Sequence, residues 1–231
     1  MHMPIANACV RFGKHFVSSS YISPEMQSLH SQAQQKGLIF LNECGLDPGI
    51  DIMSTMKVVH EAQAKGFKVV GYESYCGGLP LAEQADNPLG YKFSWNPGAG
   101  IKASKNKAVY KLHGKIVEVK EPLKVVENKD DFTGSMKLES FPNRDSTVFQ
   151  ERFNMQDCET FVRGTLRFRG FSYIISAFHD LGITSDNLLP PGLKDWRSLL
   201  EGLIRKSSSQ SHREVILKCI NMEIMGIQKE D

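Results

Sequence analysis

Apolar residues near the start of the chain fall into two helix-like stretches, each followed by a short strand-like run. Residues 4–12 predict a short helix that Gly13 ends, and residues 15–19 predict a strand. Residues 23–37 predict a second helix, because a serine, a proline and a glutamate stand at its start, and the apolar run 38–41 predicts a buried strand. This order is half of a doubly wound, Rossmann-type parallel sheet, whose crossovers are right-handed.

Two loops leave the carboxyl ends of these predicted strands, at residues 18–24 and 42–49. Ligands of open α/β sheets bind at that end of the strands, so both loops are candidate binding segments. The second loop carries Glu43 and Asp47 around a turn. Asp47 has an alternative role as a simple cap of the next helix, since aspartate often precedes Pro-Gly at a helix start.

The rest of the chain predicts a mixed α/β domain followed by helices. Residues 108–112 and 115–119 predict a hairpin, with its turn at His-Gly. Further strands are predicted at 67–75, 136–141 and 159–168, and helices at 48–65, 170–180, 193–205 and 213–222. With boundaries near Asp51 and Gly170, we expect three parts: residues 1–50 as the C-terminal part of a Rossmann-like domain, 51–170 as the mixed domain and 171–231 as a helical segment.

The composition narrows the class of protein only modestly. Hydrophobic residues make up 41% of the 231 positions and charged residues 23%, which is ordinary for a globular protein. A net charge of +2 gives no electrostatic reason to expect nucleic acid or an anionic membrane as partner. No apolar run reaches the roughly 18 residues of a membrane span, and no signal peptide is recognisable. The five cysteines form no C-x-x-C pair and the histidines have no ligand spacing, so we predict reduced thiols and no metal site.

The most distinctive stretch is YESYCGGLPLAEQADNPLGYKFSW, residues 72–95. Glycine, proline, cysteine and aromatic residues at this density are poor helix material and predict a shaped loop beside a site. Cys76 in this stretch is either a reactive thiol or, as is commoner for cysteine, a small buried side chain.

Three arginines are candidates for binding carboxylates. Arg144 stands between a proline turn and a predicted helix start, and Arg163 and Arg167, four apart on a predicted strand, point to one face. A guanidinium binds a carboxylate through two parallel hydrogen bonds. The alternative is that these arginines pair on the surface with neighbouring acids, namely Asp145, Glu151 and Glu159.

One stretch imitates a dinucleotide-binding loop. Residues 98–103, GAGIKA, fit G-x-G-x-x-A, and Glu118 and Glu121 follow about 20 residues on. The preceding strand candidate, residues 91–95, is short and interrupted by Asn-Pro, so we do not expect this stretch to bind a dinucleotide.

Taken together, the motifs resemble saccharopine dehydrogenase of the glutamate-forming type, which in animals is the second half of aminoadipic semialdehyde synthase. The resemblance covers roughly residues 4–185. The matching strings are VSSSYISP (17–24), NECGLDPGID (42–51), SYCGGLPLAEQADNPLGYKFSW (74–95), FPNRDST (141–147) and RGTLRF (163–168).

The resemblance implies a Rossmann domain for NAD or NADP, a mixed α/β domain with dimer contacts and a helical segment. It also implies the site residues. Ser20 and Tyr21 would lie where cofactor and substrate meet, Asp47 beside the reacting centre, and Cys76 and Asn96 on the nicotinamide side. The substrate's carboxylates would be held by Arg144, Thr165, Leu166 and Arg167.

The implied chemistry is hydride exchange at the carbon next to saccharopine's secondary amine, giving glutamate and aminoadipic semialdehyde, or the reverse. The proton transfers at nitrogen need a titratable group, for which Asp47, Tyr21, Cys76 and a bound water are all candidates. The alternative is a non-catalytic relative that serves as a dimerisation or partner-binding module.

The chain also departs from the family pattern. The family's Gly-rich phosphate loop is expected some 70 to 80 residues before the serine run, and the sequence does not contain it, so the chain resembles an internal piece. We expect weak NAD(P)H binding by the chain alone, because a helix N-terminus that binds pyrophosphate is missing. The compartment is expected to be mitochondrial for an animal-type form and cytoplasmic otherwise.

Overall fold

The computed structural model describes residues 2–129, 134, 136–185, 192, 195, 198–200, 202, 210, 211 and 214. The chain divides into two compact units, Met1–Val70 and Gly71–Asp231, which are described separately. The predicted helices 193–205 and 213–222 fall mainly outside the described residues. The division into three parts therefore stays a prediction.

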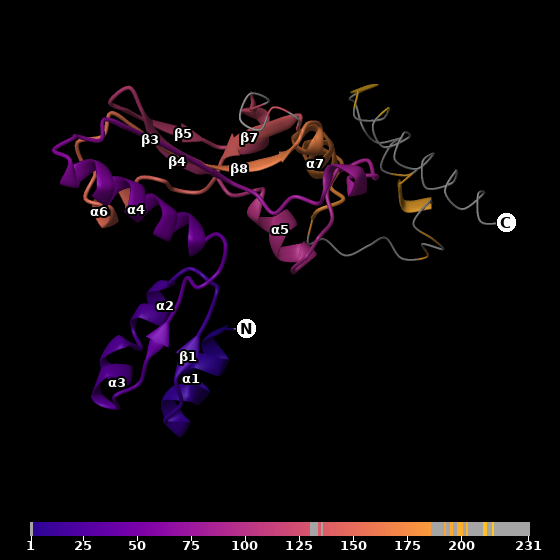
Figure 1. Cartoon of the computed structure of the whole chain (residues 1–231). Helices are drawn as coiled ribbons and strands as arrows, with labels where there is room; N and C mark the ends of the chain where they lie inside the picture. Colours follow the sequence, from indigo (N-terminus) through magenta and orange to yellow (C-terminus); the bar gives the residue numbers. More distant parts are fainter. Residues whose placement is uncertain are drawn as a thin grey trace. The chain divides into compact units, whose positions relative to one another are not determined.

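The first unit alternates helices with two short strands (Figure 1). Its elements are α1 (His2–Phe12), β1 (Phe16–Val17), α2 (Pro24–Gln27), α3 (His30–Gln35), β2 (Phe40–Leu41) and α4 (Ile50–Ala64). β1 and β2 are parallel, with Phe16 opposite Phe40. The predicted order of elements is confirmed, except that the second helix is broken into α2 and α3. At the break the Ser28 hydroxyl donates to the Glu25 carbonyl at 2.7 Å, a local bond that competes with helix continuation.

The core of this unit lies on one face of the strand pair. Its buried members, from α1, β1, α2 and the α2–α3 junction, are Ala6, Val10, Phe16, Met26 and Leu29. The helix start that the sequence predicted is confirmed, because the Ser23 hydroxyl accepts from the Met26 N–H at 3.2 Å and Pro24 opens α2. Two parallel strands alone do not establish a Rossmann-type sheet.

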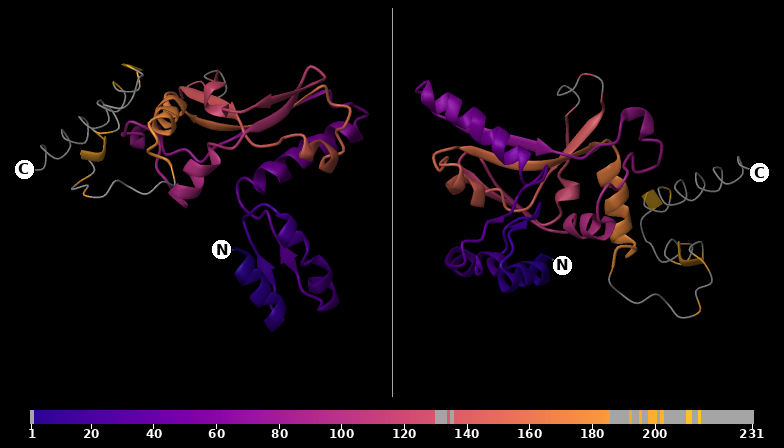
Figure 2. Two further views of the ribbon diagram at one scale, coloured as in Figure 1. Left: turned by 180° about the vertical axis from the view of Figure 1, so that it is seen from behind. Right: turned by 60° about the horizontal axis from the view of Figure 1, so that its bottom comes forward.

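The second unit is a mixed sheet with helices (Figures 1 and 2). Its strands are β3 (Gly71–Cys76), β4 (Ala108–Leu112), β5 (Lys115–Val119), β6 (Glu127–Asn128), β7 (Leu138–Pro142) and β8 (Thr160–Phe168). Its helices and short 3-10 turns are η1 (Ala82–Gln84), α5 (Pro97–Ala103), η2 (Pro122–Lys124), α6 (Val148–Arg152) and α7 (Phe171–Asp180).

β8 is the central strand of this sheet. β3 runs parallel to it along one edge, with Gly71 opposite Thr160 and Cys76 opposite Thr165. The other edge is shared by β4, paired antiparallel at Phe161, and by β7, paired antiparallel from Gly164 to Phe168. The strand order is β5-β4-β8-β7-β6. Segments far apart in the sequence therefore meet along β8.

Most predicted elements of this unit are confirmed. The hairpin β4–β5 has the predicted bounds, and positive φ angles of 48° at His113 and 78° at Gly114 suit a two-residue turn. The strand predicted from 67 begins only at Gly71, and residues 91–95 form no strand. The core under α7 consists of Tyr91, Leu123, Phe141, Phe171 and Ile175.

Candidate functional site

The first unit brings the two predicted loops together. Ser20 and Tyr21 follow β1, Asp47 follows β2, and the Tyr21 hydroxyl donates a hydrogen bond to the Asp47 carboxylate. The Ser20 N–H donates to the Ser18 hydroxyl at 3.0 Å, and the Ser20 carbonyl accepts from the Glu43 N–H at 3.1 Å. Three of the predicted site residues thus form one polar cluster at the carboxyl ends of the parallel strands.

A tight backbone loop holds Asp47 in this cluster. The Gly45 N–H donates to the Pro48 carbonyl at 3.0 Å, and Gly49 has φ 152°. A Cβ at Gly49 would lie 2.1 Å from the Gly45 carbonyl oxygen, so no other residue fits there. Gly49 and not Asp47 is the N-cap residue of α4, so the capping role considered for Asp47 is wrong.

The second unit gathers the other predicted residues along the C-terminal half of β8. Cys76 at the end of β3 lies opposite Thr165, and Phe141 of β7 lies opposite Thr165 on the other side. A Cβ at Gly77 would lie 2.3 Å from the Leu166 carbonyl oxygen. The Cys-Gly-Gly loop is therefore pressed against the strand that carries Thr165 and Leu166.

Arg144 lies in an irregular segment whose backbone is hydrogen-bonded to two strands, β4 and β8. The Val109 N–H of β4 donates to the Arg144 carbonyl at 2.8 Å, and the Asn143 N–H donates to the Arg163 carbonyl of β8 at 2.9 Å. The buried Ser146 hydroxyl accepts from the Arg163 N–H at 2.9 Å. With its backbone fixed in this way, Arg144 takes φ 53° and its side chain is exposed.

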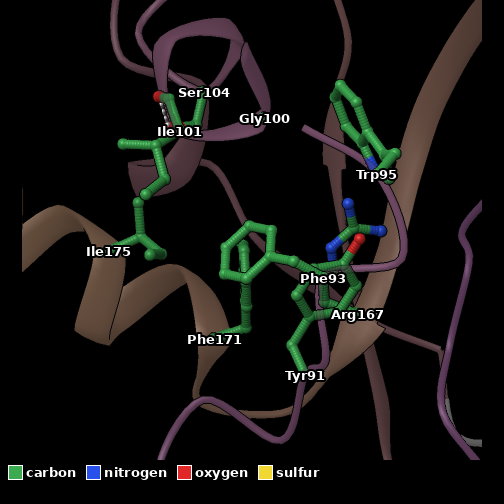
Figure 3. A pocket seen from close by; sticks show the side chains of 9 residues that line it. All are labelled: Tyr91, Phe93, Trp95, Gly100, Ile101, Ser104, Arg167, Phe171 and Ile175. Atoms are coloured by element: carbon green, nitrogen blue, oxygen red, sulfur yellow. Dashed lines mark hydrogen bonds between the residues drawn. The ribbon is translucent and has the colours of Figure 1, made fainter. Parts of the chain in front are cut away.

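Arg167 is held by aromatic rings. Its Cζ lies 4.5 Å from the centre of the Tyr91 ring and 5.2 Å from that of Phe171, and its Nη1 donates to the Leu166 carbonyl at 2.6 Å. The side chain borders a hollow of about 20 Å³ that Figure 3 shows. Its lining residues are Tyr91, Phe93, Trp95, Gly100, Ile101, Ser104, Arg167, Phe171 and Ile175. This volume holds about one water molecule, so the hollow is too small to enclose a substrate. The residues that line it hold the Arg167 side chain in place.

The two arginines of β8 have different surroundings. Arg163 is buried at 6% exposure, with its Cζ 4.1 Å from the centre of the Phe149 ring. Surface pairing therefore does not describe Arg163, which is a core residue of the sheet. Arg167 is only half-buried and remains the candidate for ligand binding.

The GAGIKA stretch is not a dinucleotide-binding loop. It forms α5, a short helix that follows no strand, and the Asn96 side chain caps it by accepting from the Ala99 N–H at 3.1 Å. Asn96 thus has a structural role in capping, and its predicted place beside the nicotinamide stays a prediction.

Sequence reasoning missed two polar groups, one opposite Arg167 on the neighbouring strand and one beside Ser104 at the edge of the hollow. Glu139 is buried in β7 directly opposite Arg167, and an isolated acid in a predicted strand gives no sign of burial. His179 of α7 contacts the Ser104 hydroxyl at 2.8 Å and the Thr184 hydroxyl at 2.6 Å. Burial, and after it the positive charge of Lys105, lowers the pKa of His179.

The opposite face of β8 is structural. The Tyr75 ring packs on Gly164, where a Cβ would lie 2.6 Å from the ring, and the Lys129 ammonium lies 4.2 Å from the ring centre. Burial first, and then the hydrogen bond to Glu73, raise the pKa of Tyr75 to about 12. Tyr75 therefore stays protonated at neutral pH. Among the described residues no three side chains form a metal-binding group, and no helix there is long and apolar enough for a membrane.

Comparison with known proteins identifies the family. The family model for the saccharopine dehydrogenase C-terminal domain matches residues 45–224. The chain belongs to this family. The resemblance drawn from the motifs is therefore confirmed.

The relatives carry names that agree with the family. A saccharopine dehydrogenase [NADP(+), L-glutamate-forming] of Pyricularia oryzae is 38% identical over 219 residues, which cover 93% of this chain and 48% of that protein. An alpha-aminoadipic semialdehyde synthase of Arabidopsis thaliana is 39% identical over 216 residues, covering 90% of this chain and 20% of that protein. The chain thus spans half or less of the length of these curated relatives.

A solved structure supports the fold. The apo histidine-tagged saccharopine dehydrogenase (L-Glu forming) from Saccharomyces cerevisiae matches with a TM-score of 0.80 at 33% identity. The match covers 96% of this chain and 54% of that one. The mixed α/β class that the sequence predicted is therefore confirmed.

Proposed function

We propose that the chain is the substrate-binding part of an NAD(P)-dependent saccharopine dehydrogenase, which cleaves saccharopine to glutamate and aminoadipic semialdehyde or catalyses the reverse. The observation that carries the proposal is the convergence on Gly164–Arg167 of segments that lie far apart in the sequence. They are the Cys-Gly-Gly loop, the Arg144 turn and the aromatic residues around Arg167. Membership of the family supports the same reaction.

The proposed substrate has three carboxylates, which gives the arginines their role. Arg144 is exposed on a rigid turn, and Arg167 is fixed by Tyr91 and Phe171. Each guanidinium can hold one carboxylate through two hydrogen bonds. Thr165 and the backbone of Leu166 between them would complete the binding of the substrate.

The proposed proton transfers belong to the polar cluster of the first unit. A nicotinamide, when bound, would supply the hydride acceptor for the carbon next to the secondary amine. The substrate, after losing this hydride and the amine proton, would be an imine that water splits. Asp47, already hydrogen-bonded to Tyr21, can accept the amine proton, and Tyr21 can relay it. Cys76 and a bound water remain alternatives for this role.

The cofactor fits this chain in part. Ser20, Tyr21 and Asp47 lie at the carboxyl ends of β1 and β2, where ligands of parallel sheets bind, so they suit the nicotinamide end. Asn96 is a further candidate. These two strands would belong to a Rossmann-type sheet. Within the described residues no parallel strand leads through a G-x-G-x-x-G turn into a helix whose N-terminus could hold the phosphates. Two relatives are named saccharopine dehydrogenase [NADP(+), L-glutamate-forming], which supports a nicotinamide cofactor, NAD or NADP.

Saccharopine titration tests the proposal. We expect saccharopine binding in calorimetry, and only slow reduction of nicotinamide when saccharopine and either cofactor are added, because the chain alone is expected to bind NAD(P)H weakly. Arg144→Gln and Arg167→Gln should each weaken binding at least tenfold, since each removes a charge-assisted pair worth about 1.5–3 kcal/mol. Arg169→Gln, an exposed arginine one residue beyond β8, is the matched control and should bind like the parent protein.

A lack of saccharopine binding would contradict the proposal. A folded protein that binds no saccharopine at about 1 mM, the upper end of usual KM values, would contradict the proposal and favour a non-catalytic relative.

A further inference from the structure

Glu139 is a buried carboxylate whose two oxygens both bind the start of α7. Its side chain is 6% exposed, its Oε2 accepts from the Gly170 N–H at 2.9 Å, and its Oε1 accepts from the Ser172 N–H at 2.6 Å. The N-cap residue of α7 is Gly170, which has no side chain that could cap the helix. The first turn of α7 is therefore fixed by a residue of β7, distant in the sequence. Acids are seldom buried so fully without a specific partner.

The turn that Glu139 fixes carries one of the rings that hold Arg167. Phe171 lies between the two N–H groups bound by Glu139, and its ring centre is 5.2 Å from the Arg167 Cζ. The Tyr91 ring contacts the Phe171 ring edge to face at 5.5 Å, with an interplanar angle of 70°. Figure 3 shows Arg167 and both rings together at the hollow. A shift of the first turn of α7 would move Phe171 and loosen the contact with Arg167.

Glu139 also lies directly opposite Arg167 in the β7–β8 register. Side chains at opposite positions of neighbouring antiparallel strands stand on the same face of the sheet, with Cβ atoms about 4.5–5.5 Å apart. The Glu139 side chain thus leaves the sheet beside the base of the Arg167 side chain.

We propose that Glu139 is a positioning residue that fixes the Arg167 guanidinium for a substrate carboxylate, by locking the first turn of α7. This inference rests on the proposed function, in which Arg167 binds that carboxylate. The ring contacts and the bond from Nη1 to the Leu166 carbonyl restrict the planar guanidinium to one orientation. A guanidinium held in this way loses less freedom on binding, so the substrate binds more tightly.

Glu139→Gln tests the inference. The amide has a similar size but only one acceptor oxygen, so one of the two N–H groups of α7 faces an NH₂ group and the turn loosens. We expect the Kd for saccharopine to rise about tenfold, and kcat to change much less, since Glu139 touches no reacting atom. Ser172→Ala is the matched control on the same turn, because the Ser172 hydroxyl is buried with no hydrogen-bond partner among the described residues and its peptide N–H is kept.

A double-mutant cycle separates positioning from general destabilisation. In an Arg167→Lys background, Glu139→Gln should have little further effect on Kd, because the guanidinium that Glu139 positions is no longer present. Phe153→Leu, in the aromatic cluster with Tyr72 and Phe161, should lower the Tm without raising Kd. Additive effects of Glu139→Gln and Arg167→Lys on Kd would overturn the inference.

A measurement without ligand distinguishes this inference from the proposed function. The Tyr91 and Phe171 rings should shift the NMR signals of the Arg167 side chain, which Arg167→Lys identifies by their disappearance. In Glu139→Gln we expect these signals to move toward the values of an exposed arginine. Unchanged signals would overturn the positioning role even if saccharopine binds. Shifted signals in a protein that binds no saccharopine would instead support the structural step and refute the function.

Discussion

The backbone of Gly77 lies against the carbonyl of Leu166, so closely that a Cβ at position 77 would stand 2.3 Å from the carbonyl oxygen. The same oxygen accepts the 2.6 Å hydrogen bond from Arg167 Nη1. The Leu166 carbonyl thus contacts the Cys-Gly-Gly loop and also binds Arg167, the arginine that we assign to the substrate. The need for glycine here is one of space, because the loop and the strand are in contact at this point.

Gly77→Ala should therefore destabilise the protein. The added methyl group has to push the loop or β8 aside, which typically costs about 1–3 kcal/mol. Urea unfolding measures the loss of free energy. Gly78→Ala is the control, since a Cβ there meets nothing within 4 Å, and it should change the stability by less than about 0.5 kcal/mol. Equal effects of the two substitutions would contradict the contact with Leu166.

Arg144→Gly should separate binding from stability. Arg144 has φ 53°, a conformation that costs a residue with a side chain about 1 kcal/mol and that glycine adopts freely. Its side chain is exposed, so we expect the free energy of unfolding to stay within about 1 kcal/mol of the parent value. Saccharopine affinity should nevertheless fall at least tenfold in calorimetry. A large loss of stability with unchanged affinity would make Arg144 a structural residue.

Tyr21 and Asp47 should be energetically coupled. Tyr21→Phe and Asp47→Ala each remove one side of a half-buried hydrogen bond, which for an ionised acceptor contributes about 1.5–3 kcal/mol. In a double-mutant cycle on chemical unfolding we expect a coupling energy of about 1–2 kcal/mol. Ser19→Ala in the same loop should have an effect below about 0.5 kcal/mol. A coupling energy near zero would mean that the two side chains do not interact in solution.

The hydrogen bonds of His179 are satisfied by a neutral ring with its proton on Nε2. The Ser104 hydroxyl donates to the Ile101 carbonyl at 2.6 Å, so its oxygen accepts from Nε2–H, and Nδ1 accepts from the Thr184 hydroxyl. The pKa of His179 is lowered in the folded state by burial and by Lys105. Between this lowered pKa and the unfolded value of about 6.5, the unfolded chain binds more protons.

Stability should therefore fall as the pH drops below about 6.5, and the contribution of His179 should be fully present above that value. His179→Gln should remove this part of the pH dependence in thermal unfolding at a series of pH values. His60→Gln, exposed on α4, replaces a histidine outside this network and should leave the acid-side fall in place. An unchanged pH profile in His179→Gln would contradict this account.

The sequence by itself determined the elements and the family. Apolar spacing and cap residues predicted α1, β1, β2, the β4–β5 hairpin and α7, because these depend on local propensity and on turn residues such as Gly114. Uncommon motifs were sufficient to identify the family, and they contained the residues that we assign to the site.

Only the tertiary structure decided which of these residues lie together and what each of them contacts. The buried state of Arg163 and Glu139, the role of Asn96 as a cap and the contact of Gly77 with Leu166 all depend on the pairing of distant strands around β8. Strand pairing brings together positions separated by many residues, and a local pattern of polar and apolar residues does not record which partners meet. For that reason the sequence could predict that Arg163 and Arg167, four apart on one strand, share a face. It could not predict that Arg163 belongs to the core and Arg167 to the site.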